Sequence, residues 1–187
     1  MESVLVVTPE FPYPLDAGSK IREYHTLRVL AGQLDVTLIS LRTPSISESD
    51  ISEVEAMGID VHTVPHDRSK REALLRFVLS RKSYRVAKFN NKRLERKIEK
   101  ITERKSLDFA WIHFLNTLTA LPSDLRCPVV LDQHNAERMY WESFKNGRVI
   151  DRIFAHINIS RIKSLQNQKS DQIDVLLSVD SEDSLEA

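Results

Sequence analysis

The chain has 187 residues, of which 41% are apolar and 29% charged, a balance typical of one globular domain rather than of a disordered chain. No apolar run approaches the roughly 20 residues that a membrane-spanning helix needs, and the start, Met1-Glu2-Ser3, lacks the basic lead of a signal peptide. The single cysteine, Cys127, excludes an intrachain disulfide framework and favours a reducing cytoplasm.

The net charge is zero, but its distribution is uneven. Between Asp67 and Lys105, 15 Lys and Arg stand against 5 Asp and Glu, a net charge of +10, and the rest of the chain carries −10. A segment of this kind suits an anionic partner such as membrane phospholipid. The alternative is a solvated helix face with few acidic neighbours.

Short β-branched runs alternate with longer helical patterns, which is typical of parallel βαβ units. The expected strands are residues 3–8, 35–41, 59–64, 109–114, 128–132 and 173–178, and the expected helices are 18–31, 47–57, 68–80, 88–105 and 148–169. In the first helix, an inward stripe is expected from Ile21, Tyr24, Leu30 and either His25 or Leu27. The prediction is therefore an α/β fold, an open doubly wound parallel sheet of about six strands with helices on both faces.

Ligands of such sheets bind beyond the carboxyl ends of the strands, so the residues that follow each strand are the candidate site. After the first strand, a proline-rich loop leads to Gly18-Ser19 at a helix start, where free backbone N–H groups and the helix dipole suit a phosphate. The spacing is neither Gly-x-Gly-x-x-Gly nor a Walker loop, which disfavours ordinary dinucleotide or ATP binding. The alternative is a helix start without a ligand.

Histidines follow the fourth and fifth strands. His113 and His134 are candidates for titratable contacts with sugar hydroxyls, and Glu137 shares a helical face with His134. One histidine and one carboxylate make a poor metal site, so no metal is expected. Arg22, one turn into the first helix, faces either the crevice or solvent. Trp141 is expected to pack in the core, with the alternative that Tyr140 and Trp141 flank an acceptor groove.

Residues 4–9 and 11–22 resemble the opening of glycosyltransferase family 4 enzymes of GT-B architecture. Residues 128–137 are similar to the family's fifth-strand segment, and residues 170–178 resemble the strand near the end of its first domain. The resemblance implies two Rossmann-like domains with the active site between them, of which residues 1–187 form the N-terminal, acceptor-side domain. The C-terminal domain, which holds most of the nucleotide-sugar donor, is expected to lie outside this chain.

The resemblance also implies a reaction, the retaining, metal-independent transfer of a sugar from a nucleotide-sugar to a glycan or lipid-linked acceptor. It places Gly18 and Ser19 near the donor phosphates and His113 and His134 near the transferred sugar. No cofactor is expected besides the donor, which is a co-substrate. The acceptor contacts are expected from Tyr13, Asp16, Arg22, Asn135 and Glu137.

Some members of the family sit on membranes through a basic helical surface of the first domain. Here such a surface would lie between Arg68 and Lys105 and would place the protein at the inner face of the membrane. Within it, one interfacial helix is expected to carry Leu74, Leu75, Phe77, Val78 and Leu79 beside Arg71, Arg76, Arg81 and Lys82.

Two other classes of function stay open. One is a stand-alone glycan-binding or membrane-binding module without catalysis. The other is an adaptor that binds anionic surfaces; its nucleic-acid version is disfavoured because aromatic residues are scarce in the basic segment. The chain ends about one turn into an acidic helix start, which favours a longer parent protein in which this domain by itself is inactive.

Overall fold

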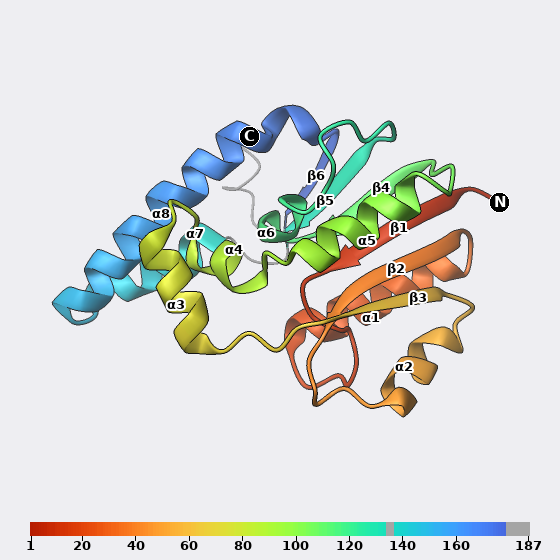
Figure 1. The fold of residues 1–187 in the computed structure, drawn as a ribbon, viewed down its shortest axis with the longest axis horizontal. Helices are drawn as coiled ribbons and strands as arrows, with labels where there is room; N and C mark the ends of the chain where they lie inside the picture. The colour runs from red at the N-terminus through yellow and green to blue at the C-terminus, as the bar shows by residue number, and fades with distance from the viewer. Residues whose placement is uncertain (134–136, 179–187) are drawn as a thin grey trace.

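The protein is a three-layer α/β domain, and its computed structural model describes residues 1–133 and 137–178 (Figure 1). The strands are β1 (Ser3–Thr8), β2 (Asp35–Arg42), β3 (Asp60–Pro65), β4 (Phe109–His113), β5 (Val129–Gln133) and β6 (Val175–Ser178). All pair in parallel in the order β3-β2-β1-β4-β5-β6, which confirms the predicted open, doubly wound sheet.

The helices on one face of the sheet are α1 (Gly18–Ala31) and α2 (Glu48–Glu55). They cover β1, β2 and β3 through an apolar cluster that includes Val6, Leu27, Leu38 and Val54. The other face carries α3 (Lys70–Leu79), α4 (Tyr84–Phe89), α5 (Lys92–Thr102), α6 (Leu115–Leu118), α7 (Glu137–Glu142) and α8 (Val149–Lys169). This division follows from right-handed crossovers, because the chain runs one way along the sheet as far as β3 and the other way from β3 to β6.

One expected helix is divided in two in the structure. The helix expected over residues 88–105 is wrong at its start, because α5 begins at Lys92 and residues before it form the separate helix α4. Asn90 is extended, and the Asn91 side chain accepts a hydrogen bond from Arg93 N (2.9 Å), so Asn91 is the N-cap of α5. The first strand of the βαβ series and the long helix α8 lie where they were expected.

The inward face of α1 was predicted correctly only in part: of the expected stripe, Leu27 is buried and Leu30 packs against the apolar cluster. The residues of α1 that are buried are Glu23 and Leu27, whereas Ile21 is 42% exposed and His25 is exposed. Glu23 precedes Leu27 by four residues, so both lie on the face that packs on the sheet. A carboxyl group therefore occupies the position next to the strand ends.

Candidate functional site at the switch point of the sheet

The candidate site lies at the carboxyl ends of the neighbouring strands β1 and β4. The chain continues from β1 toward β2 on one side of this pair and from β4 toward β5 on the other side. Ligands of open α/β sheets bind outside the carboxyl ends of the strands at this topological switch point. The strand interiors are apolar, but polar side chains lie near the strand ends. Thr8, the last residue of β1, donates from Oγ1 to Ser40 Oγ near the end of β2 (2.8 Å), and both residues are buried. His113 ends β4 and is also buried.

His113, Asp132 and Arg22 form a connected polar group beside this edge. The parallel register places His113 next to Asp132 of β5, and His113 Nδ1 lies 3.7 Å from Asp132 Oδ2. Arg22 of α1 donates from Nη2 to Asp132 Oδ1 at 2.8 Å. Both His113 and Asp132 are buried, while the Arg22 side chain is 41% exposed. The Arg22 guanidinium thus lies against a buried carboxyl group and connects α1 to β5, which is on the other side of the switch point.

Phe114, the residue after β4, has an unusual backbone. Its φ is +66°, in the region that favours glycine, and its ring is buried. Such conformations are costly for a bulky side chain and concentrate at binding and catalytic sites. The Phe114 ring lies under the guanidinium of Arg85, whose Cζ is 5.3 Å from the ring centroid. The strained residue therefore directs an aromatic face toward a cation of α4.

The N-terminus of α1 carries Gly18 and Ser19. Its N-cap, Ala17, makes no side-chain capping hydrogen bond, whereas α2 and α3 both begin with a complete capping box. The first turn of α1 contains no acidic residue. A methyl group added at Gly18 would meet nothing within 4 Å. These features leave an open, electropositive helix end of the kind that binds anions.

A cavity of about 220 Å³ opens beside these elements; we call it the switch-point pocket. Its polar lining comes from the β1 loop, α1 and α4: Glu10, Ser19, Glu23, Arg85 and Lys88. Its aromatic lining comes from α4, the end of β4 and α7: Tyr84, Phe89, Phe114, Tyr140 and Trp141. A wall that combines aromatic rings with placed polar groups suits a small-molecule ligand.

Glu23 is the most unusual polar residue of this pocket. It is 1% exposed, and its Oε2 has no hydrogen-bond partner among the described residues. Burial raises the pKa of the Glu23 carboxyl well above its ordinary value, and the nearby carboxylates of Glu10 and Asp132 raise it further. A neutral carboxyl group donates as well as accepts a hydrogen bond. Glu23 is thus equipped to bind a hydroxyl group in either role.

The structure brings together only part of the predicted site. Ser19 lines the switch-point pocket. Arg22 and His113 lie close together because each contacts the carboxylate of Asp132. His134 and Asn135 fall outside the described residues, and Glu137 is the first residue of α7, with its side chain outside them too.

Tyr13 and Asp16 lie on another side of the first loop. The Tyr13 ring packs 5.9 Å from that of Tyr24, and Asp16 pairs with Lys20 at 2.8 Å along a separate shallow cavity. The hydrogen bond from Lys20 lowers the pKa of Asp16, which therefore stays ionised.

Sequence reasoning missed Asp132 as the partner of Arg22, and it missed Glu23, Arg85 and Lys88. The spacing of Glu23 and Leu27 was a usable signal, because residues four apart share a helical face. Trp141 is buried, as expected, and it also lines the switch-point pocket. Its Nε1 has no hydrogen-bond partner among the described residues.

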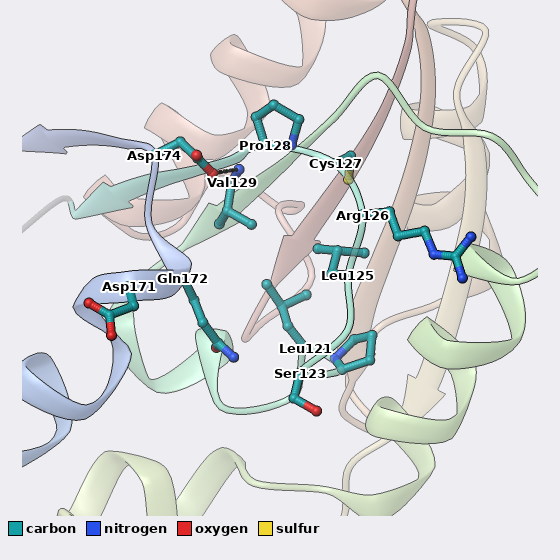
Figure 2. A pocket seen from close by; sticks show the side chains of 11 residues that line it. Leu121, Ser123, Leu125, Arg126, Cys127, Pro128, Val129, Asp171, Gln172 and Asp174 are labelled. Carbon is teal, nitrogen blue, oxygen red and sulfur yellow. Dashed lines mark hydrogen bonds between the residues drawn. The ribbon is translucent and has the colours of Figure 1, made fainter.

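A larger cavity, of about 390 Å³, lies at the opposite edge of the sheet (Figure 2). Its wall includes Val129, the first residue of β5, whose backbone N–H donates to Asp174 Oδ2 at 2.8 Å. Leu121 and Leu125 line it from the loop before β5. This cavity lies at the amino ends of the strands, and one of its two carboxylates, that of Asp174, already accepts a backbone hydrogen bond, so we assign the candidate site to the smaller pocket.

Within residues 1–133 and 137–178, no group of three or more His, Cys, Asp or Glu is arranged to hold a metal ion. In the same residues, no helix combines the length and the apolar character needed to cross a bilayer. Comparison with protein-family models and with curated protein sequences gives no match. The function of the site therefore has to be argued from its own residues.

Proposed function

We propose that this chain is the acceptor-binding domain of a retaining, metal-independent glycosyltransferase, which transfers a sugar from a nucleotide-sugar donor to a glycan or lipid-linked acceptor. The observation that carries the proposal is the switch-point pocket, whose wall joins aromatic rings to the open N-terminus of α1. Aromatic faces suit the apolar faces of sugar rings, and the carboxyl and hydroxyl groups of Glu23 and Ser19 suit sugar hydroxyls.

The chemistry of sugar transfer gives each part a role. The bond between the anomeric carbon and the donor diphosphate breaks as positive charge develops on the sugar ring and negative charge on the leaving group. Backbone N–H groups at Gly18 and Ser19, with the dipole of α1, favour the departing diphosphate. His113, held beside Asp132, lies at the strand end from which the transferred sugar is contacted in the enzymes that this sequence resembles.

The first test is binding of unlabelled glycans to the ¹⁵N-labelled chain. Monosaccharides and short oligosaccharides should shift the amide resonances of Ser19 and Glu23 and the indole resonance of Trp141, and should leave those around the opposite cavity, such as Val129, unchanged. In the enzyme that contains this domain, release of nucleoside diphosphate should require the glycan and should persist in EDTA. Saturable binding without turnover would favour the stand-alone glycan-binding module, and the absence of glycan binding would contradict both proposals.

A second proposal concerns location. We propose that the domain docks on the inner face of a membrane through an apolar surface of α3 and the start of α8, here called the α3–α8 surface. Its exposed members are Leu74, Leu75, Val78, Leu79, Val149, Ile150 and Ile153. Leu79 is 77% and Val149 70% exposed, values too high for residues that serve only the core.

The two helices form one surface. The rings of Phe77 and Phe154 lie 4.7 Å apart, and Figure 1 shows α3 beside the N-terminal half of α8. Phe77, expected on the interfacial side, is instead buried and joins the two helices. Exposed cations flank the apolar residues: Lys70, Arg71, Arg76, Arg81, Lys82, Arg148 and Arg152. Apolar side chains ringed by cations match the interface of an anionic bilayer.

The basic segment is not a single face, however. Arg68 donates to backbone carbonyls at the end of α4, Arg85 lines the pocket, and Lys105 pairs with Asp60 at 2.6 Å.

Cosedimentation with lipid vesicles tests the proposed docking of the α3–α8 surface on a membrane. Binding should require anionic lipid, weaken as salt is added, and fall in Leu75→Ser and Leu79→Ser but not in the exposed control Val29→Ser. Equal binding to neutral vesicles, or loss in the control alone, would contradict the assignment.

A further inference from the structure

The charges of the switch-point pocket do not cancel. Lys88 Nζ lies 3.6 Å from Glu10 Oε1, so these two residues largely neutralise each other. Glu23 is buried among other carboxylates, and its raised pKa favours the neutral form. Arg85 is therefore the uncompensated charge of the pocket, because no carboxylate of the described residues lies within ion-pair distance of it.

Arg85 is also held in a fixed orientation. Its Cζ lies 5.3 Å from the centroid of the Phe114 ring and 5.8 Å from that of Tyr140. A guanidinium stacked on aromatic rings keeps the N–H groups at its edge available, and their fork matches the two oxygens of a carboxylate or phosphate. Phe114 holds the first of these faces at the cost of a strained backbone, with φ at +66°.

Independent polar groups of the wall lack partners. Glu23 Oε2 and Trp141 Nε1 are both buried, and neither has a hydrogen-bond partner among the described residues. Buried polar atoms are nearly always hydrogen-bonded, so two unpartnered atoms on residues that line one cavity are available to hydroxyl groups of a ligand. The volume, about 220 Å³, is below the roughly 300 Å³ at which pockets for drug-sized ligands begin, so the pocket encloses one sugar ring and the rest of a longer glycan would lie outside it.

We infer that the switch-point pocket binds one sugar unit bearing a carboxylate or phosphate group, with Arg85 contacting the anion and Glu23 and Trp141 contacting hydroxyls. The inference rests on the proposed acceptor function and narrows it to an anionic acceptor. Neutral sugars would leave the guanidinium edge without a partner, and a bare anion would leave Glu23 and Trp141 without theirs. Recognition therefore requires both parts of one ligand.

The experiment is a set of titrations followed by calorimetry and by Trp fluorescence, using glucuronic acid, glucose 6-phosphate, glucose and inorganic phosphate as probes. Either of the first two should bind about 10-fold or more tightly than glucose and than phosphate. Which of them binds tighter distinguishes a carboxylate-bearing from a phosphate-bearing acceptor. Phosphate that binds as tightly as glucose 6-phosphate would identify a simple anion site and overturn the inference.

Variants separate the two halves of the contact. Arg85→Gln should lower affinity for the anionic sugar about 10-fold and leave glucose binding unchanged. Arg85→Lys should restore part of the loss, and the exposed control Arg93→Gln on α5 should have no effect. Trp141→Phe should weaken both sugars and spare phosphate. Circular dichroism confirms that each variant is folded. Glucose binding equal to that of the anionic sugars would overturn the inference while leaving the glycan-acceptor proposal intact.

Discussion

Arg22 and Asp132 are 110 residues apart in the chain, yet Arg22 Nη2 and Asp132 Oδ1 lie 2.8 Å apart at the carboxyl edge of the sheet. The pair joins α1, which packs over one half of the sheet, to β5 in the other half. It also holds the buried carboxyl group of Asp132 beside His113. A buried carboxylate of this kind depends on each of its partners.

Arg22→Gln is expected to destabilise the domain by about 1–2 kcal/mol, because it removes a cation from a buried carboxylate. The loss is smaller than for a fully buried pair since the Arg22 side chain is 41% exposed and partly screened by solvent. Urea unfolding measures the change. Arg28→Gln, an exposed site on the same helix, should change the free energy of unfolding by less than about 0.5 kcal/mol; an equal loss in both variants would contradict the role of the pair.

Glu23→Gln is expected to change how stability depends on pH. The raised pKa of Glu23 means that the folded state holds this proton more tightly than the unfolded state. The free energy of unfolding therefore falls as pH rises above the ordinary glutamate value, by about 1.4 kcal/mol for each unit of pKa shift.

Glutamine cannot ionise, so the Glu23→Gln variant should match the wild type in acid and exceed it increasingly toward neutral pH. Urea unfolding from pH 4 to 8 gives the difference curve, with the exposed Glu55→Gln as the control for the chemical change. A difference that stays constant with pH would contradict a neutral Glu23.

Asn158→Ala is expected to cost about 2–3 kcal/mol, because the fully buried Asn158 side chain connects α8 to the pocket wall. Its Oδ1 accepts from Tyr84 N at 2.8 Å, and its Nδ2 donates to Phe154 O at 2.9 Å. Hydrogen exchange should show faster exchange of the Tyr84 amide. The exposed Asn167→Ala on the same helix should leave that amide protected, and fast exchange in both variants would indicate general loosening instead.

Gly58 and Gly18 make a matched pair for testing backbone strain. An added methyl group meets nothing within 4 Å at either position, but Gly58 has φ of +82°. Gly58→Ala should destabilise by about 1 kcal/mol, and Gly18→Ala should be neutral or slightly stabilising because alanine favours a helical backbone. Thermal unfolding distinguishes the two variants. A similar loss of stability in both would mean that the positive φ of Gly58 is not the cause of the destabilisation.

Arg68→Ala is expected to cost about 2–3 kcal/mol and to loosen the end of α4. Arg68 Nη1 donates to Ala87 O, Lys88 O and Asn90 O at 2.7–2.8 Å, which satisfies carbonyls that the helix leaves open. The exposed Arg71→Ala on α3 is the control for lost charge. An equal change in the two variants, measured by urea unfolding, would show that charge alone matters.

The sheet was predictable from the sequence because strands buried on both faces are short apolar runs, as Val4 to Val7 illustrates. The break between α4 and α5 was readable as well, since Asn91 is a favoured N-cap residue, but the run of charged residues on both sides suggested one helix. Glu23 was overlooked because carboxyl groups on helices are usually solvent-exposed.

The site was less predictable than the fold. Arg22 was assigned to the crevice from its place in the first helix, but its partner Asp132 depends on which strands become neighbours. Likewise, Arg85 enters the pocket only because the first turn of α4 packs against Phe114 and Tyr140 of α7, which are distant from it in the chain. Local patterns carry no information about such distant contacts.

Two arginines donate hydrogen bonds to backbone carbonyl groups at the ends of neighbouring helices. Arg161 of α8 donates to Phe77 O and Lys82 O at the end of α3, and Arg68 does the same for α4. The helices that expose Leu79 and that carry Arg85 are therefore clamped at their ends and joined by a short connection. The exposed apolar residues of α3 and the pocket cation Arg85 of α4 thus lie on neighbouring helices whose ends are fixed by hydrogen bonds, which connects the outer surface of the domain to its pocket.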